Sequence, residues 1–222
     1  MSINIAIDGP AGAGKSTIAK RVAEKLSFIY VDTGAMYRAM ALYMLRGGVD
    51  VKDEAAVTDK CSNVHVGITY ENGEQRVLLN DEDVSNLIRS EEVGNAASAV
   101  AVYSSVRAKL LELQQSLART HNVVMDGRDI GSAVLPDAQV KIYLTASVHT
   151  RAERRYKELV KKGGSPDIQV IEQDIVDRDY QDMHRKISPL CQAEDAVLID
   201  SSQLSIDGVV DGILNIYKER CC

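Results

Sequence analysis

The sequence predicts an α/β fold with a parallel sheet that is covered by helices on both faces. Three observations lead to this prediction. A short apolar strand at residues 3–8 runs into a glycine-rich turn, and Ile18, Val22 and Leu26 then repeat at helical spacing. Apolar strands and helical patterns alternate along most of the chain. Crossover helices between parallel strands bury both faces of such a sheet.

The remaining elements follow in order. A second strand is expected at 28–31, and a helix then carries Met36, Met40 and Met44 as far as the glycine pair 47–48. The later segments, read from their periodicity, are a mostly helical stretch 99–119, strands at 123–125, 140–144 and 196–199, a charged helical stretch 148–188 broken at 163–166, and an amphipathic C-terminal helix from 206.

A β-hairpin interrupts this alternation. Val64, Val66, Ile68 and Tyr70 occupy every second position, and Asn72-Gly73 follows before two more apolar residues. Asn-Gly between alternating segments is a strong hairpin signal. We therefore expect an inserted β-structure near residues 60–90.

Composition restricts the class of protein. The 222 residues suit one domain with inserted lobes, and the net charge of -6 argues against general nucleic-acid binding. No apolar run is long enough for a membrane span, and the first residues do not resemble a secretory signal. The four cysteines form no CxxC pair, so we expect reduced thiols, a cytoplasmic protein and an exposed tail at Cys221-Cys222.

A phosphate-binding loop is the strongest motif. The segment GPAGAGKS at residues 9–16 fits GxxxxGK[ST] between a predicted strand and a predicted helix. Its backbone N–H groups and the helix N-terminus would bind phosphate oxygens, Lys15 would reach the β- and γ-phosphates, and Ser16 would bind Mg²⁺. The residues expected to bind ATP are Gly9, Pro10, Ala11, Gly12, Ala13, Gly14, Lys15, Ser16 and Thr17.

Other motifs narrow the class of nucleotide-binding protein. A guanine-reading NKxD and an LSGGQ-like transporter signature are both absent from the sequence. A small-molecule kinase is the simplest remaining class. A regulatory protein that binds a nucleotide without transferring phosphate is the alternative from a different class.

Two polar segments follow predicted strands, where ligands bind in open α/β sheets. One is DTGAMYR at 32–38, and the other is DGRDIGS at 126–132. They would bring Thr33, Tyr37, Arg38, Arg128 and Asp129 to the edge of the sheet beside the phosphate loop.

Five segments together resemble the bacterial cytidylate kinases, in the same order and over nearly the whole chain. They are GPAGAGKST, DTGAMYR, NAASAVA, DGRDIGS and RDYQDMHRKISPL. The resemblance implies an adenylate-kinase-like, three-layer P-loop fold with a five-stranded parallel sheet, a small antiparallel β insertion and a helical lid. It divides one kinase domain into a core (about 1–32, 99–150 and 187–222), a nucleoside-monophosphate lobe (about 33–98) and a lid (about 151–186).

The resemblance also implies the acceptor site. Thr33, Tyr37 and Arg38 would face CMP or dCMP. Ser98, Arg107 and Asp129 would read the cytosine edge, which presents an amino donor and a carbonyl acceptor. The implied phosphate and ribose contacts are Arg128, Arg185, Arg178 and Asp182. Asp126 would orient Arg128 or organise Mg²⁺ through water.

Ser98 and Arg107 raise a geometric question. They are nine residues apart, which places them on opposite sides of one straight helix. We therefore expect a helix boundary at 103–105; a continuous helix would rule out one of the two assignments.

The predicted lid carries two sets of charges at helical spacing. The first is Arg151, Arg154 and Arg155, of which Arg154 is expected at the ATP site. The second is Arg178, Asp182 and Arg185. No four-cysteine cluster accompanies them, so no structural zinc is expected.

The expected reaction transfers the γ-phosphoryl group of ATP to CMP or dCMP. The acceptor phosphate is already anionic, so positioning and charge neutralisation suffice without a general base. Lys15, Arg128, Arg178 and Arg185 are the predicted catalytic residues. A related kinase of UMP, AMP or another small acceptor is the nearest alternative, and a monomer without nucleic-acid or membrane partners is expected.

Overall fold

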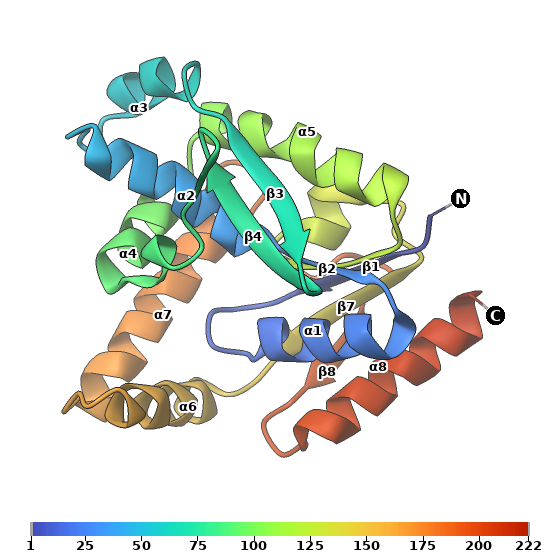
Figure 1. Cartoon of the computed structure of the whole chain (residues 1–222). Coiled ribbons are helices and arrows are strands. Elements are labelled where there is room, and N and C mark those ends of the chain that lie inside the picture. Colours follow the sequence, from blue (N-terminus) through green and yellow to red (C-terminus); the bar gives the residue numbers. More distant parts are fainter. Residues whose placement is uncertain (1, 222) are drawn as a thin grey trace. The chain divides into compact units, whose positions relative to one another are not determined.

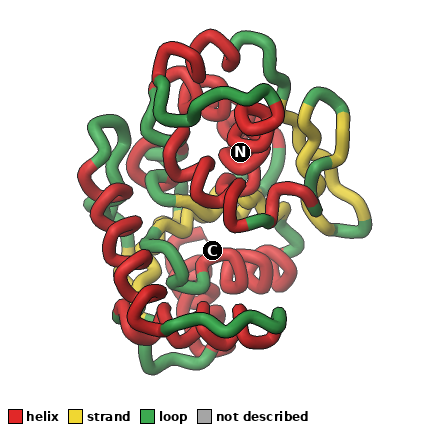
Figure 2. Tube along the Cα trace, turned by 90° about the vertical axis from the view of Figure 1, so that its left-hand side faces the viewer, coloured by secondary structure: helices red, strands yellow, loops and turns green. Residues whose placement is uncertain are grey.

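The structure is a computed structural model that describes residues 2–221. It divides into two compact units. Unit 1 comprises residues 29–123 with Ser2, and unit 2 comprises residues 3–28 and 124–221. Most of the chain is helical (Figure 2). The predicted division into core, lobe and lid stays a prediction.

The main sheet has five strands, as the family resemblance implied, and their order is β2-β6-β1-β7-β8. Figure 1 labels β1, β2, β7 and β8 of this sheet. The strands are β1 (Asn4–Asp8), β2 (Ile29–Asp32), β6 (Val123–Gly127), β7 (Val140–Thr145) and β8 (Val197–Asp200). β7 pairs in parallel with β1, Ile7 opposite Ile142, and with β8, Leu144 opposite Ile199. All five residues of β6 are buried, as expected for a central parallel strand.

Unit 2 packs helices against its strands. Helix α1 (Lys15–Leu26) buries Ile18 and Val22, and α8 (Ile206–Cys221) buries Val209 and Ile213. α1 and α8 lie side by side, and the exposed ion pairs Arg21–Asp207 and Lys25–Asp211 join them. A short helical turn, η2 (Ile130–Val134), follows β6.

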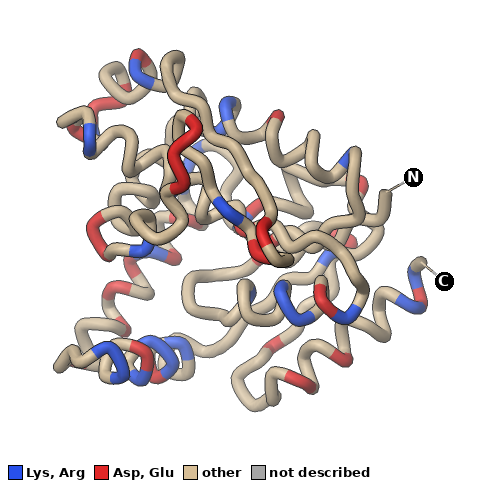
Figure 3. Tube along the Cα trace, viewed as in Figure 1, with Lys and Arg blue, Asp and Glu red and all other residues tan. Residues whose placement is uncertain are grey.

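The predicted charged stretch forms two helices, α6 (Val148–Lys161) and α7 (Ile168–His184). They end and begin around the predicted glycine-rich break, where Gly163 has a φ of 86°. The centre of their contact is an apolar cluster that includes Ala152, Ile171 and Ile175. Lys and Arg residues are frequent along α6 (Figure 3).

Unit 1 contains most of the remaining helices. α2 (Thr33–Arg46) buries the predicted stripe of Met36, Met40 and Met44. α3 (Glu54–Cys61) was not predicted; Asp53 caps it by accepting hydrogen bonds from two backbone N–H groups. α4 (Glu91–Val100) and α5 (Ser104–Thr120) complete the set, with a short turn η1 (Leu87–Arg89) before them.

The predicted hairpin is present in unit 1. β3 (Val66–Glu71) and β4 (Glu74–Leu79) pair antiparallel with Glu71 opposite Glu74, and a short β5 (Glu82–Asp83) extends the sheet. Asn72 and Gly73 have φ values of 52° and 80°. Two consecutive positive φ angles are what a type I′ turn requires, which explains why Asn-Gly occupies it.

The predicted helix boundary is confirmed. α4 ends at Val100 and α5 begins at Ser104, with Tyr103 in extended backbone between them. Ser98 and Arg107 therefore belong to different helices, which removes the conflict over their orientation.

The termini and cysteines complete the description. No disulfide joins the cysteines within residues 2–221, where Cys61 is buried and Cys191 is exposed. Cys221 is the last residue of α8 and is half-buried, so the expectation of an exposed tail is wrong for it; Cys222 lies outside the described residues. No described helix is both long enough and apolar enough to cross a bilayer.

Candidate active site

The phosphate loop of unit 2 connects β1 to α1. Gly9, Gly12 and Gly14 have φ values of 147°, 75° and 89°, in the region that favours glycine. A Cβ on Gly9 would lie 1.9 Å from the carbonyl oxygen of Leu144 on the neighbouring strand. The loop therefore requires glycine at its first position for space as well as for backbone conformation.

Lys15 is buried at the start of α1. Its Nζ donates to the carbonyl of Pro10 over 2.7 Å, which folds the side chain back over the loop. Burial, followed by repulsion from Arg128, lowers the pKa of Lys15 to about 7, although the carboxylates of Asp126 and Asp8 oppose the shift. An anionic ligand beside Lys15 would supply the charge partner that stabilises its ammonium form.

Asp126, at the end of β6, meets the phosphate loop directly. The Oγ of Ser16 donates to Oδ2 of Asp126 over 2.9 Å. This contact brings together the hydroxyl predicted to bind Mg²⁺ and a carboxylate from the DGRD segment. Hard oxygen donors of this kind suit Mg²⁺, which usually takes few protein ligands and completes its shell with phosphates and water.

The carboxylate of Asp8 binds the backbone of the turn that follows β6. It accepts hydrogen bonds from the backbone N–H groups of Ile130 and Gly131 over 2.8 and 2.7 Å. Burial raises the pKa of Asp8 to about 6 despite these bonds, with a smaller contribution from the carboxylate of Asp129. Asp8 therefore fixes the backbone that carries Asp129.

Charged residues that directly follow β6 form largely buried ion pairs in unit 2 with residues at the end of α7 and just after it. Nε of Arg128 donates to Oδ2 of Asp182 over 2.8 Å, and Nη2 of Arg185 donates to Oδ1 of Asp129 over 3.0 Å. Burial works against the charge of Asp182, but Arg128, followed by Arg178 and Arg185, outweighs it and lowers the pKa of this carboxyl. The structure thus brings together all the arginines that were predicted to neutralise transferring phosphate.

Arg154, predicted at the ATP site, contacts the phosphate loop from α6. Its Nη1 donates to the carbonyl of Ala13 over 3.4 Å, and its Nη2 donates to the carbonyl of Ser201 over 2.8 Å. The guanidinium is only partly buried. Its position beside the loop is compatible with contact to a bound nucleotide.

Three predicted residues of unit 1 lie in the first two turns of α2, namely Thr33, Tyr37 and Arg38. Asp32 caps this helix by accepting from the N–H of Ala35 over 2.8 Å, and its other oxygen accepts from Nη2 of Arg38 over 3.0 Å. Thr33, the first helical residue, is buried. The predicted acceptor segment therefore has a fixed backbone and a paired arginine.

Arg107 and Tyr37 also lie together in unit 1. The guanidinium carbon of Arg107 is 5.8 Å from the centre of the Tyr37 ring, a distance typical of cation–π contacts. Nη1 of Arg107 also donates to the carbonyl of Ala101 over 3.4 Å, in the break between α4 and α5. Ser98 lies half-buried near the end of α4. The break between the helices thus positions Arg107 next to the α2 side chains.

The family model described as cytidylate kinase matches residues 5–219. The chain belongs to the cytidylate kinase family. Members of this family are nucleoside-monophosphate kinases, so the chain is an enzyme and a P-loop transferase.

Curated relatives agree with the family assignment. The cytidylate kinase of Leuconostoc mesenteroides is 50% identical over 99% of this chain and 98% of its own length. Those of Ligilactobacillus salivarius and a Geobacillus species are each 49% identical, over 98% and 99% of this chain and 97% and 98% of their own. A solved structure of an uncharacterized protein from Eubacterium ventriosum shares the fold alone, with a TM-score of 0.57, 12% identity, and coverage of 99% of this chain and 100% of that one.

Some residues that build the site of this cytidylate kinase family member had no signal in the sequence analysis. Gln75 contacts the backbone of Asp32, Asp8 supports the turn at Ile130, and Asp179 contacts the phosphate loop. Each acts through a backbone group far away in the sequence. A spacing pattern cannot reveal such a contact, because it contains no information about which loops meet.

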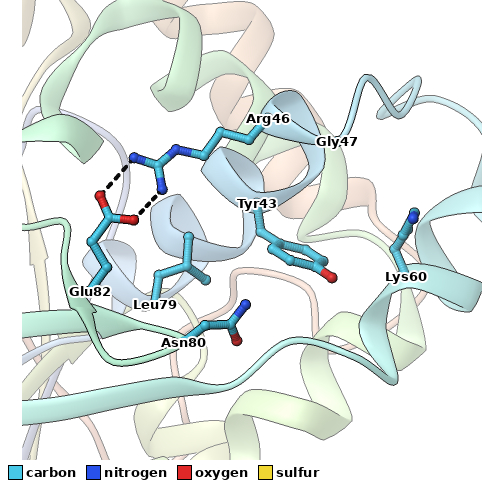
Figure 4. Close-up of a pocket in the computed structure, with 7 residues that line it drawn as sticks. All are labelled: Tyr43, Arg46, Gly47, Lys60, Leu79, Asn80 and Glu82. Carbon is cyan, nitrogen blue, oxygen red and sulfur yellow. Dashed lines mark hydrogen bonds and ion pairs between the residues drawn. The ribbon is translucent and has the colours of Figure 1, made fainter.

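A separate hollow of about 340 Å³ lies in unit 1. Its rim contains Arg46, whose guanidinium forms two hydrogen bonds with Glu82, and also Tyr43 and Lys60 (Figure 4). None of the predicted site residues lines it. Its one arginine is already paired with Glu82.

Proposed function

We propose that the chain transfers the γ-phosphoryl group of ATP to CMP or dCMP, giving ADP and CDP or dCDP. The observation that carries the proposal is the 2.9 Å hydrogen bond between Ser16 and Asp126. It joins the phosphate loop to the DGRD segment, so the predicted donor residues and Arg128 belong to one continuous set of contacts. Family membership supports the choice of acceptor.

The donor nucleotide would be bound by unit 2. Backbone N–H groups of the loop and the N-terminus of α1 would hold the phosphates, and Lys15 would neutralise the transferring group. Ser16 and Asp126 fit Mg²⁺ as oxygen donors, one directly and one directly or through water. The ion, when bound, would neutralise charge on the phosphates.

The acceptor phosphate would be bound by the arginines of unit 2. Arg128 and Arg185 present guanidinium groups already oriented by Asp182 and Asp129. Arg178 and Asp182 would contact ribose and phosphate. Preoriented donors cost little reorganisation when charge develops, which is how such a site accelerates transfer without a general base.

The nucleoside would be recognised by Ser98, Arg107 and Asp129, with Thr33, Tyr37 and Arg38 also facing it. A guanidinium complements the cytosine carbonyl, and a carboxylate complements its amino group. Uracil presents a carbonyl where cytosine presents the amino group. Asp129 would therefore disfavour UMP.

A coupled assay of ADP release tests the proposal. The purified protein is given Mg²⁺ and ATP with CMP, dCMP, UMP, AMP or dTMP in separate reactions. We expect ADP formation with CMP and dCMP at a kcat/KM at least about tenfold above that with UMP. ATP-binding protein without CMP-dependent ADP formation would refute the activity, whereas equal rates with UMP would refute only the cytosine preference.

A further inference from the structure

Arg151 and Asp179 form a buried ion pair within unit 2 that the proposed reaction does not use. Arg151 lies in the first turn of α6 and Asp179 lies in the second half of α7. Nη1 of Arg151 donates to Oδ2 of Asp179 over 2.6 Å, and the two side chains are 5% and 12% exposed. Two charges at this depth are costly to desolvate, so their placement calls for a reason beyond the packing of α6 on α7.

Both members of the pair contact the same residue of the phosphate loop. Arg151 donates to the carbonyl of Ala11 over 2.9 Å, and the N–H of Ala11 donates to Oδ1 of Asp179 over 3.3 Å. The pair therefore binds both the backbone N–H and the backbone carbonyl of one loop residue. A side chain that served only to join α6 to α7 would not need either contact.

Arg151 is itself held rigidly. Its Nε donates to the carbonyl of Ala146 over 2.9 Å. Its aliphatic part lies against the loop, since a Cβ on Gly12 would be 3.3 Å from the Cβ of Arg151. The guanidinium thus has little freedom to turn away from Ala11.

Cationic side chains bind other carbonyl groups of the loop as well. Lys15 holds the carbonyl of Pro10, and Arg154 contacts the carbonyl of Ala13. When the carbonyls of successive loop residues are bound on the protein side, the conformation of the loop backbone is largely set before a ligand arrives. Preorganised backbone donors bind an anion with a smaller entropy cost.

We propose that Arg151 and Asp179 are a positioning pair, which holds the Ala11 backbone in the conformation that binds the phosphates of ATP. The inference rests on the proposed role of the loop as the ATP site. In this proposal α6 and α7 contribute to ATP binding, because they set the conformation of the loop before any phosphate contacts it. Loss of the pair should weaken ATP binding and leave the affinity for CMP unchanged.

The central experiment measures ATP binding to a variant that keeps its fold. Removing one partner leaves a buried charge and destabilises the protein, whereas replacing both with apolar residues of similar volume is often neutral for stability. We therefore choose the double variant Arg151→Met/Asp179→Leu in the full chain. Thermal unfolding checks its fold, and calorimetry with Mg²⁺ and ATP, without CMP, gives the dissociation constant.

Matched substitutions on the same helices provide the control. Arg155 lies four residues after Arg151 and pairs with Glu158, with its side chain 40% exposed, and Asp177 is exposed on α7. Arg155→Met/Asp177→Leu therefore removes the same two charges without contact to the loop. Its ATP dissociation constant and its KM for CMP should match those of the unmodified protein.

We expect the Arg151/Asp179 double variant to unfold near the normal temperature, bind ATP about tenfold or more weakly, and keep its KM for CMP within about twofold. A stable double variant with normal ATP affinity would overturn the inference, because a purely structural pair would behave in that way. Failure of the unmodified chain to bind ATP would instead overturn the proposed function and this inference with it.

Arg151→Lys gives a second test that does not depend on the stability of the double variant. The lysine keeps the positive charge beside Asp179 but cannot bind Ala146, Ala11 and Asp179 in the geometry of the guanidinium fork. A rise of about threefold or more in the KM for ATP, with the KM for CMP unchanged, is expected. If the KM values of the variant for ATP and for CMP both equal those of the unmodified protein, Arg151 does not position the loop.

Discussion

Gln75 on β4 forms two hydrogen bonds with the backbone of Asp32, the residue that caps α2. The N–H of Asp32 donates to Oε1 of Gln75 over 2.8 Å, and Nε2 of Gln75 donates to the carbonyl of Asp32 over 3.2 Å. The amide thus pairs with the main chain much as a neighbouring strand would. Through this contact the inserted hairpin fixes the point from which Thr33, Tyr37 and Arg38 extend.

Gln75→Ala should therefore weaken binding of the acceptor without affecting the donor. Two hydrogen bonds to a partly buried backbone are lost, so the KM for CMP should rise about tenfold while the KM for ATP stays within about twofold. Steady-state kinetics with each substrate varied checks this. Arg76→Ala is the control, since the adjacent Arg76 pairs with the exposed Glu71; a similar rise in that variant would contradict the role of Gln75.

Lys15→Met should abolish phosphoryl transfer and leave the fold intact. A charge contact to the transferring group is typically worth about 3 kcal/mol, so kcat should fall by about a hundredfold or more. The unfolding temperature should not fall, because the substitution removes a buried cation whose pKa burial has already lowered. The exposed Lys25, paired with Asp211, provides the control variant Lys25→Met. Normal turnover in Lys15→Met would show that the loop lysine is not required for transfer.

Asp129→Asn should affect both selectivity and stability. It leaves the buried Arg185 without its charged partner, and breaking one side of such a pair costs about 3–5 kcal/mol. The same substitution places an amide where a carboxylate would accept the cytosine amino group, so the preference for CMP over UMP should narrow about tenfold or more. Chemical denaturation and the ratio of kcat/KM values measure the two effects. Unchanged discrimination in a folded variant would remove the base-reading role from Asp129.

The raised pKa of Asp8 predicts a stability that falls as pH rises. Its pKa is about 6 in the folded protein, against an ordinary value of 3.8, so the folded state binds the proton more tightly. The favourable contribution is complete below pH 3.8 and is lost as pH rises through 6, a change of about 3 kcal/mol.

Asp8→Asn removes this titration, whatever the variant's absolute stability. Urea denaturation at a series of pH values from about 4 to 7 gives the free energy of unfolding of each protein. The free energy of unfolding of the unmodified protein should fall by about 2 kcal/mol relative to that of the variant as pH rises across this range. Parallel curves would contradict the raised pKa.

Local patterns predicted the fold because each depends on residues close together in the chain. Met36, Met40 and Met44 repeat with the period of a helix, and Asn72-Gly73 suits the two positive φ angles of its turn. The five predicted parallel strands are confirmed. Their signal was also local, because a short apolar segment between two helices is typical of a buried strand. The helix α3 was missed because its apolar stripe is short and its main signal is a single capping aspartate.

The site was predicted less completely than the fold. The phosphate loop could be found because a binding loop needs glycines and a lysine at fixed spacing, and the resemblance to a family supplied the arginines. What the sequence did not contain was the pairing among them. Arg185 contacts Asp129, and Arg128 contacts Asp182, over separations of more than fifty residues.

The sequence by itself determined that this chain is a P-loop α/β protein with an inserted hairpin, because periodicity, glycine placement and turn chemistry are local properties. Only the tertiary structure decided which groups hold the phosphate loop in place. Arg151 and Asp179 reach Ala11 from two helices that lie far along the chain, and Asp8 reaches the turn after β6 in the same way. Such contacts depend on how loops meet after folding, and no spacing along the chain encodes that meeting.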